Sequence, residues 1–309
     1  MRKSRITTLA ALGVAAALTL AGCASDGAGG TLEMAGKAPE KAAGSGDKGT
    51  ITLGFLPSWT DGLSTAYLLQ DQLGKLGYDV KMQTLSDAGP LYAGLSQGDV
   101  DVFPSAWPEV TQKAYMDKYA GSIDDLGTYY DNARLTIAVP EYSDIDSIDQ
   151  LKGKGSQFDG KIIGIEPGAG LTAQTQKMMP EYGLNGEYQL VTSSTAAMLT
   201  ELKSATDKKQ DIAVTLWRPF WANSAFPVKD LKDPKGAMGK PEGLHFLGSK
   251  DFAKKHPDAA KLISKIVLDD AQYGSLEDTV VNTFGEGKEP QAIDAWIAEH
   301  GDEFDWIKK

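Results

Sequence analysis

The chain has 309 residues, which is enough for two domains, and 41% of them are hydrophobic and 24% charged, as in soluble globular proteins. Its 31 basic and 42 acidic side chains leave a formal net charge of −11, which argues against nucleic acid or anionic lipid as an electrostatic partner. A single cysteine excludes a disulfide within the chain and any paired-cysteine metal or redox site.

The first residues predict export. A basic start (Arg2, Lys3, Arg5) precedes an apolar run from Ile6 to Leu20, which is shorter than the ~20 residues that a membrane-spanning helix needs. The run ends in Leu-Ala-Gly-Cys, which resembles a bacterial lipobox. We therefore predict a signal peptide over residues 1–22 and a lipid on Cys23 that anchors an extracytoplasmic protein to the bacterial cell membrane. The alternative is an ordinary signal peptide with a chance cysteine.

A segment with almost no large apolar side chains follows. Residues 23–49 are rich in Gly, Ala, Ser and Lys, a composition that buries too little surface to fold. We predict a flexible, lipid-anchored linker and a folded body that begins at Thr50.

The body alternates strands and helices. The predicted strands are Ile51–Phe55, Tyr78–Met82, Asp101–Phe103, Leu135–Val139, Lys161–Ile165, Tyr188–Val191 and Ile212–Leu216. The predicted helices are Thr60–Leu76, Leu91–Ser96, Thr172–Met179, Ala196–Ser204, Phe252–Lys255, Asp258–Asp270, Ser275–Phe284 and Pro290–His300. This order predicts an α/β fold with parallel sheets. Two such units and a helical tail suggest two lobes, residues 50–138 plus 230–309 and residues 139–229, with a cleft between them.

No catalytic apparatus is visible in the sequence. His245, His256 and His300 belong to no HExxH or Gly-x-Ser-x-Gly motif, and each is interpreted as a packing or surface histidine. No phosphate-binding loop, dinucleotide fingerprint or metal-ligand spacing occurs. The sequence thus predicts a protein that is not an enzyme and has no cofactor and no metal.

Three tryptophans stand close to the ends of predicted strands: Trp59, Trp107 and Trp217. Ligands of open α/β sheets bind outside the carboxyl ends of the strands, so the three indoles could converge on the cleft. The alternative for each indole is plain core packing. Converging indole faces attract a quaternary ammonium, with ~0.5–2 kcal/mol per contact.

A second, polar contact site is needed for tight binding, since a micromolar ligand requires about 8 kcal/mol. The turn from Gly164 to Thr172 joins a strand to a helix through small residues, and free N–H groups at a helix start bind an anion. Indoles and turn together predict a zwitterion with trimethylammonium and carboxylate ends.

At these blocks the sequence resembles the substrate-binding lipoproteins of glycine betaine/proline (quaternary ammonium) ABC transporters. The similar blocks are Asp99–Phe103 with Ala106-Trp107, Gly164–Gly170, Asp211–Val214 with Trp217-Arg218-Pro219, and Leu231–Gly236. The resemblance implies a two-lobed periplasmic-binding-protein fold (type II) with hinge closure. It also implies a cation cage of Trp59, Trp107 and Trp217, a carboxylate held by the Gly170 and Leu171 amides, and partnership with a permease and its ATPase.

Two departures leave the ligand open. Betaine binders often carry a histidine where this chain has Gln112, whose amide can still donate to a carboxylate. Choline binders have a tyrosine at the position of Leu135 and an acid that contacts the choline hydroxyl, and this chain does have Asp61. We expect glycine betaine, with Asp61 directed at loop backbone or a helix start. A choline or carnitine receptor is the alternative, and a secreted enzyme on a similar scaffold is less favoured.

Overall fold

The computed structural model describes residues 48–308. The predicted signal peptide, the lipid site Cys23 and all but the end of the predicted linker lie outside the described residues. The first strand, β1 (Thr50–Phe55), begins where the folded body is predicted to begin. Within the described part of the chain, no helix is long and apolar enough to cross a membrane.

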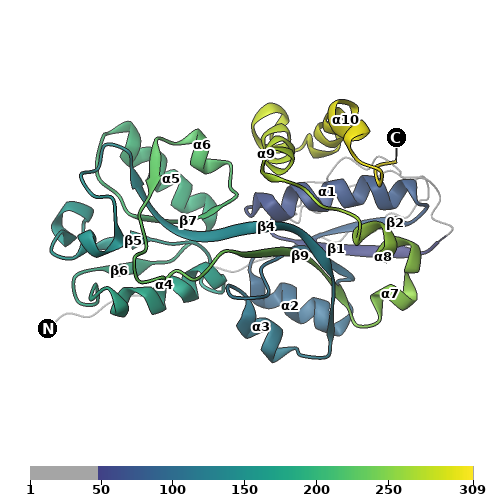
Figure 1. The fold of residues 1–309 in the computed structure, drawn as a ribbon, viewed down its shortest axis with the longest axis horizontal. Coiled ribbons are helices and arrows are strands. Elements are labelled where there is room, and N and C mark those ends of the chain that lie inside the picture. Colours follow the sequence, from purple (N-terminus) through teal and green to yellow (C-terminus); the bar gives the residue numbers. More distant parts are fainter. Residues whose placement is uncertain (1–47, 309) are drawn as a thin grey trace, which may run out of the picture. The chain divides into compact units, whose positions relative to one another are not determined.

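The first lobe is built on one sheet (Figure 1), whose strands run in the order β2-β1-β3-β9-β4. Strand β1 pairs in parallel with β2 and β3, whereas β9 runs antiparallel to both β3 and β4. Its elements up to the crossing strand are β1, α1 (Thr60–Lys75), β2 (Asp79–Thr84), α2 (Ala88–Gln97), β3 (Val102–Ala106) and α3 (Lys113–Lys118).

The second lobe has its own strands beyond the crossing point. Strand β5 pairs in parallel with β6 and β7, and β4 pairs antiparallel with β7 and β8. Its elements are β5 (Lys161–Ile163), α4 (Gly170–Glu181), β6 (Gln189–Val191), α5 (Thr195–Asp207), β7 (Val214–Arg218), α6 (Ala222–Ala225) and β8 (Val228–Asp230). Short 3₁₀ turns at Ile148–Leu151 and Gly155–Phe158 precede β5.

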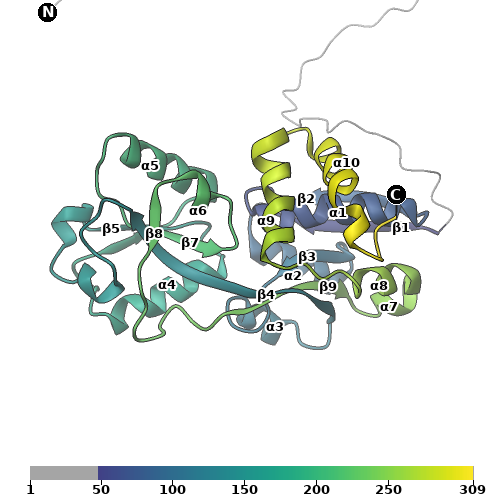
Figure 2. The same cartoon turned by 45° about the horizontal axis from the view of Figure 1, so that its top comes forward.

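One long strand belongs to both sheets. Strand β4 (Ile123–Pro140) pairs with β9 (Glu242–Ser249) as far as Ala133 and with β7 from Arg134 onward. It runs from one lobe into the other in both ribbon views (Figures 1 and 2). The change of partner falls a few residues before the predicted lobe boundary at residue 138, and the lobe boundaries stay a prediction.

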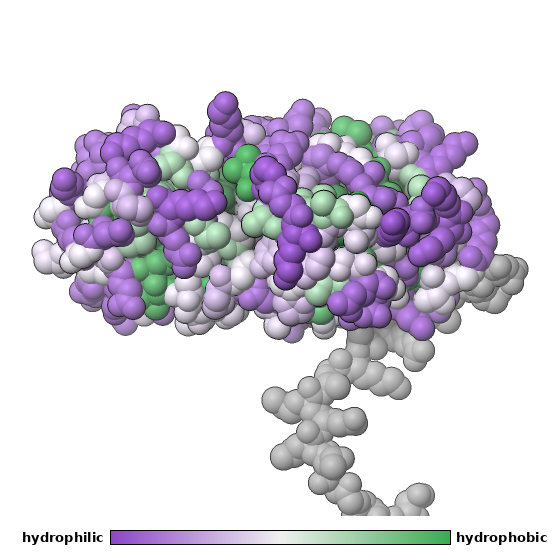
Figure 3. Space-filling view, turned by 90° about the horizontal axis from the view of Figure 1, so that it is seen from below, coloured by the Kyte–Doolittle hydropathy of each residue, from purple (hydrophilic) through white to green (hydrophobic). Residues whose placement is uncertain are grey.

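The chain after β9 stays in the first lobe. Helices α9 and α10 contact α1 there (Figure 2). The elements are α7 (Phe252–Lys255), α8 (Pro257–Ile263), α9 (Asp270–Asp278), a π-helical turn (Thr279–Phe284), α10 (Glu289–His300) and a 3₁₀ turn (Gly301–Glu303). Trp296 and Trp306 are buried among them as packing residues. The face shown in Figure 3 is mostly hydrophilic with small apolar patches.

Several predicted elements are wrong in type or extent. The sheets are mixed rather than parallel, because β9 runs antiparallel to β3 and β4, and β4 runs antiparallel to β7 and β8. The predicted helix over residues 258–270 ends at Ile263, and a capping box of Asp269 and Gln272 starts the next helix at Asp270, earlier than predicted. Trp217 lies inside β7 rather than after it.

Candidate functional site: a cavity between the lobes

Every predicted ligand-binding residue lines one cavity between the lobes. The cavity is small, with about 30 Å³ of space open to the centre of a water molecule. The lining residues are Trp59, Asp61, Trp107, Thr111 and Gln112 from the first lobe and Leu135, Ile165, Ala169, Gly170, Leu171 and Trp217 from the second.

The three indoles are held in place by different contacts. The Trp59 ring donates its Nε1–H to the Glu166 carboxylate over 3.0 Å, and the Trp107 ring donates to Asp61 over 3.2 Å. Trp217 stacks on Phe220 with ring centroids 3.9 Å apart. All three are at least nine-tenths buried. Trp59 and Trp107 are therefore held through their N–H edges and Trp217 through one ring face, and all three line the cavity.

Asp61 is a buried carboxylate at the start of α1. Its Oδ2 accepts hydrogen bonds from Ser105 Oγ over 2.6 Å and from Trp107 Nε1, and the Gly62 backbone also donates to the carboxylate. Burial raises the pKa of Asp61. The prediction that Asp61 points at loop backbone or a helix start accounts for only part of these contacts, because two of its partners are side chains that the sequence did not suggest.

Free backbone donors also line the cavity. Helix α4 begins at Gly170, and its N-cap residue Ala169 supplies no side-chain cap. Among the described residues, no acceptor takes a hydrogen bond from the N–H groups of Gly170 and Leu171. A helix start with unpaired N–H groups attracts an anion through these donors and through the helix dipole.

Gln112 presents a donor rather than an acceptor. Its Oε1 accepts from the Trp107 backbone N–H and from Tyr92 Oη, each over 2.8 Å. Because the Trp107 N–H can only donate, the amide oxygen must face it, and the NH₂ group is left without a partner among the described residues. Gln112 can thus supply a neutral donor at the edge of the cavity.

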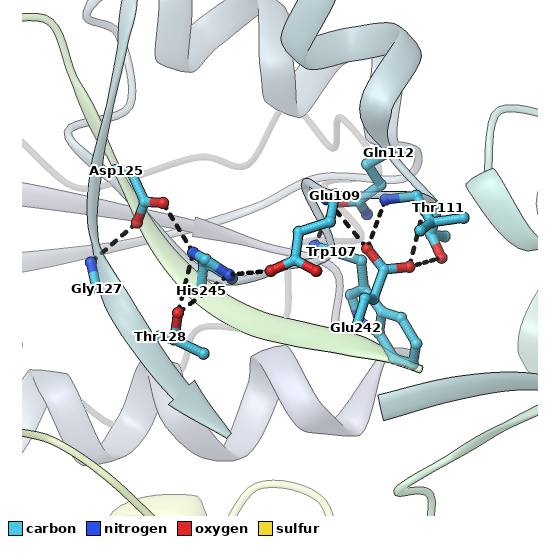
Figure 4. Close-up of polar contacts among 10 residues, drawn as sticks. Trp107, Glu109, Thr111, Gln112, Asp125, Gly127, Thr128, Glu242 and His245 are labelled. Carbon is cyan, nitrogen blue, oxygen red and sulfur yellow. Dashed lines mark hydrogen bonds and ion pairs between the residues drawn. The ribbon is translucent and has the colours of Figure 1, made fainter. Parts of the chain in front are cut away.

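The loop that carries Trp107 and Gln112 is anchored by Glu242, the first residue of β9 (Figure 4). The Glu242 carboxylate accepts from the backbone N–H groups of Glu109, Val110 and Thr111 over 2.9–3.1 Å, and also from the Thr111 hydroxyl. Burial raises the pKa of Glu242 despite these bonds. Strand β9 therefore holds the cavity loop directly.

His245, also on β9, joins the same loop to β4 (Figure 4). Its Nδ1 lies 2.8 Å from Asp125 Oδ2, and its Nε2 lies 3.3 Å from Glu109 Oε1. Burial lowers the pKa of His245, but the hydrogen bonds and charges of the two carboxylates outweigh burial and leave the pKa raised. The interpretation as a packing histidine is confirmed. No group of three or more His, Cys, Asp and Glu within residues 48–308 is placed to hold a metal ion.

Glu277 on α9 is a fully buried acid beside the cavity. It accepts a hydrogen bond from the Thr60 hydroxyl, next to Asp61, and one from the Trp221 backbone of the second lobe. Burial, reinforced by the nearby Asp61 charge, raises the pKa of Glu277 to about 8. Its side chain is therefore mostly protonated at neutral pH.

Comparison with known proteins identifies the family. The model of the substrate-binding domain of ABC-type glycine betaine transport systems matches residues 49–299. The chain belongs to this family. As a member it is a substrate-binding protein of an ABC transporter and not an enzyme, and the resemblance drawn from its sequence blocks is confirmed.

Solved structures and curated relatives agree with this assignment. A glycine betaine, L-proline ABC transporter binding protein (ProX) from Borrelia burgdorferi is 30% identical over 84% of this chain and 97% of its own, with a TM-score of 0.78. Lactococcal OpuAC, in a closed conformation complexed with glycine betaine, is also 30% identical, over 84% of this chain and 99% of its own, with a TM-score of 0.77.

Among curated proteins, the glycine betaine/carnitine transport binding protein GbuC of Listeria monocytogenes is 34% identical over 158 residues, about half of each chain. The glycine betaine/proline betaine-binding periplasmic protein of Salmonella typhimurium is 25% identical over 287 residues, which cover 78% of this chain and 84% of its own. The mixed α/β fold of this protein is thus that of the two-lobed periplasmic binding proteins.

Sequence reasoning missed the residues that hold the cavity walls. Glu242 lies 131 residues from Thr111 and Glu166 lies 107 residues from Trp59, so no local spacing connects them. Glu166 does stand in the glycine-rich turn that the sequence singled out, but nothing in that turn indicates where its side chain points. Thr111 adjoins Gln112 along the chain, and Ile165 and Ala169 stand in the glycine-rich turn, but nothing in the sequence marked these three as lining residues.

Proposed function

We propose that this protein is an extracytoplasmic receptor that captures glycine betaine and delivers it to the permease of an ATP-driven importer. The observation that carries the proposal is the chemistry of the cavity lining. The lining combines the indoles of Trp59, Trp107 and Trp217 with Gly170 and Leu171, whose backbone N–H groups have no acceptor among the described residues. A ligand with a trimethylammonium and a carboxylate end matches both kinds of group.

The cation side is suited to methyl groups. A quaternary ammonium cannot donate hydrogen bonds, so it gains from ring faces at ~0.5–2 kcal/mol per contact and from burial of its methyl groups. Leu135 pairs with Trp217 across β4 and β7 and adds an aliphatic surface there. On this proposal Trp59, Trp107 and Trp217 form the cage, hereafter the tryptophan cage.

The anion side supplies neutral donors. The Gly170 and Leu171 amides and the Gln112 NH₂ can each donate to a carboxylate, and the start of α4 adds the favourable end of a helix dipole. Asp61 would bind no ligand group on this reading, since its contacts with Ser105 and Trp107 give it a role inside the first lobe.

A choline receptor is the second candidate, because buried Asp61 lines the cavity and could accept a hydroxyl hydrogen bond. Carnitine and proline betaine share the same cationic and anionic ends as glycine betaine. Calorimetric titration of glycine betaine, proline betaine, carnitine and choline tests the proposal. We expect glycine betaine to bind most tightly; tighter binding of choline would reverse the order, and no binding of any of the four would refute the proposal.

The cellular placement is proposed from the sequence. Two relatives are named periplasmic proteins, and the lipobox-like start favours a lipid anchor at Cys23. An anchored receptor would stay close to its permease while the linker of residues 23–49 gives it reach.

A further inference from the structure

A single buried carboxylate connects the tryptophan cage of one lobe to the other lobe. Glu166, in the second lobe between β5 and α4, is 5% exposed. Its Oε2 accepts from Trp59 Nε1 over 3.0 Å and its Oε1 accepts from Ser58 Oγ over 3.2 Å, and both donors belong to the first lobe. The same carboxylate accepts from the backbone N–H and the hydroxyl of Thr195, both over 2.9 Å, inside the second lobe.

The backbone of Glu166 organises the anion side. Its carbonyl oxygen accepts from the Ala169 N–H over 3.0 Å and from the Thr172 hydroxyl over 2.9 Å. These bonds shape the turn that leads into the free N–H groups of Gly170 and Leu171. One residue thus touches the cation side through its side chain and the anion side through its main chain.

The four side-chain bonds respond differently to lobe opening. If the lobes separate, the bonds to Thr195 stay, because both partners move with the second lobe, whereas the bonds to Ser58 and Trp59 must break. The contact with Trp59 therefore contributes only to the closed arrangement. Since a ligand can shift an equilibrium only through interactions that differ between the two states, this bond adds to closure and hence to affinity.

The charge of Glu166 also acts on the ring itself. The Trp59 indole lies between the carboxylate, which holds its N–H edge, and the cavity, which it lines. A negative charge at the positive edge of an aromatic ring favours a cation on the ring face.

From these contacts we propose that Glu166 is a positioning residue that latches Trp59 to the second lobe in the closed state and orients the ring for a cationic ligand. The inference deepens the proposed function and rests on it for the identity of the ligand. Glu166 need not touch the ligand for this role.

The chain contains a matched control with the same type of bond. Trp107 donates its indole N–H to Asp61 over 3.2 Å, but both residues belong to the first lobe, so this bond survives opening. Two double-mutant cycles then separate a latch from a purely structural contact: Trp59→Phe with Glu166→Gln, and Trp107→Phe with Asp61→Asn. Phenylalanine keeps a ring and removes the N–H donor in both cycles.

Titration of glycine betaine into the members of each cycle is the measurement, with urea unfolding of the ligand-free proteins beside it. We expect Glu166→Gln to weaken binding about tenfold or more, as for loss of a hydrogen bond to a charged acceptor, but much less in the Trp59→Phe background. The coupling energy between Trp59 and Glu166 should be larger when it is measured from the binding free energies than when it is measured from the unfolding free energies of the ligand-free proteins. In the control cycle, coupling should appear in unfolding as well. Strictly additive effects of Trp59→Phe and Glu166→Gln on affinity would overturn the latch.

The distance between two labels, one in each lobe, tests the latch without any ligand. The only cysteine of the chain is Cys23, so a form that begins after it takes two labels cleanly, at the exposed positions Lys203 in the second lobe and Lys254 in the first. Failure of the wild type to bind any quaternary ammonium would refute the proposed function alone. The latch would then be judged by the label distance without ligand: a longer mean distance in Glu166→Gln than in wild type supports it, and equal distances overturn it.

Discussion

Replacing Gly170 by alanine should prevent the lobes from closing tightly around a ligand. A Cβ at this position would lie 2.1 Å from the carbonyl oxygen of Thr111 and 2.5 Å from its Cγ2, across the boundary between the lobes. Real Cβ contacts are essentially never shorter than 3.0 Å. Thr111 cannot yield easily, because the Glu242 carboxylate holds its N–H and hydroxyl.

The size of the effect follows from the overlap. Forcing one extra methyl group into a packed contact costs about 1–3 kcal/mol. If that cost falls on the closed state alone, Kd rises by a factor of roughly 5 to 150. The stability of the open, ligand-free form should not fall, since alanine in the first turn of α4 is a better helix former than glycine and restricts the unfolded chain. The ligand-free protein should therefore unfold at the same temperature or slightly higher.

Calorimetric titration with glycine betaine and thermal unfolding without ligand check this prediction. Gly274→Ala on α9 is the neutral control, because a Cβ there meets nothing within 4 Å. Gly168→Ala is a graded control: its Cβ would lie 2.2 Å from a carboxylate oxygen of Asp87, a side chain that can rotate away at a smaller cost. An unchanged Kd for Gly170→Ala, with the fold intact, would show that the close contact at Thr111 is not needed for binding.

Three further predictions concern the cage, pH and the anchor. Trp107→Ala or Trp217→Ala should weaken glycine betaine binding more than about tenfold in calorimetry, and phenylalanine should restore part of the affinity; unchanged curves would identify these indoles as core packing. Because the pKa of Glu277 is raised from 4.5 to about 8, the folded state retains a proton that the unfolded state loses. The free energy of unfolding should therefore fall as pH rises through that window, and urea unfolding of Glu277→Gln should show a flatter slope. Cys23→Ala should leave an uncleaved precursor or release the protein into the medium, as membrane fractionation would reveal; a variant that remains lipidated would contradict the anchor.

The cavity residues could be predicted because their signals are local. Trp107 directly follows β3, and Gly170 starts a helix after a glycine-rich turn, so a strand end and a helix start located both sides of the site. Asp61 and Gln112, a few residues along the chain from Trp59 and Trp107, were identified only through the family resemblance. Family resemblance then assigned these positions to one ligand, and the structure brings all of them to the same cavity.

Strand β9 and the first half of β4 could not be predicted in the same way. Strand β9 contains Glu242, two glycines and His245, and the first half of β4 contains Asp124, Asp125 and Gly127, residues that are poor strand formers. They form strands because they pair with each other across more than a hundred residues of sequence. Their polar side chains have partners of their own: Glu242 holds the cavity loop, and His245 bonds to Asp125 of β4.

The polarity of the cavity favours a zwitterion over a simple cation. Choline would meet the tryptophan cage as well as glycine betaine does, but it brings no anion to the start of α4. The buried N–H groups of Gly170 and Leu171 would then lack a charged acceptor, and an unsatisfied buried donor costs about 1–3 kcal/mol. The hydroxyl of choline could reach Asp61 instead, yet that carboxylate is already engaged by Ser105 and Trp107. A ligand carboxylate satisfies donors that have no other partner, whereas a ligand hydroxyl would compete with Ser105, Trp107 and the Gly62 backbone for the Asp61 carboxylate. For this reason we expect glycine betaine to bind more tightly.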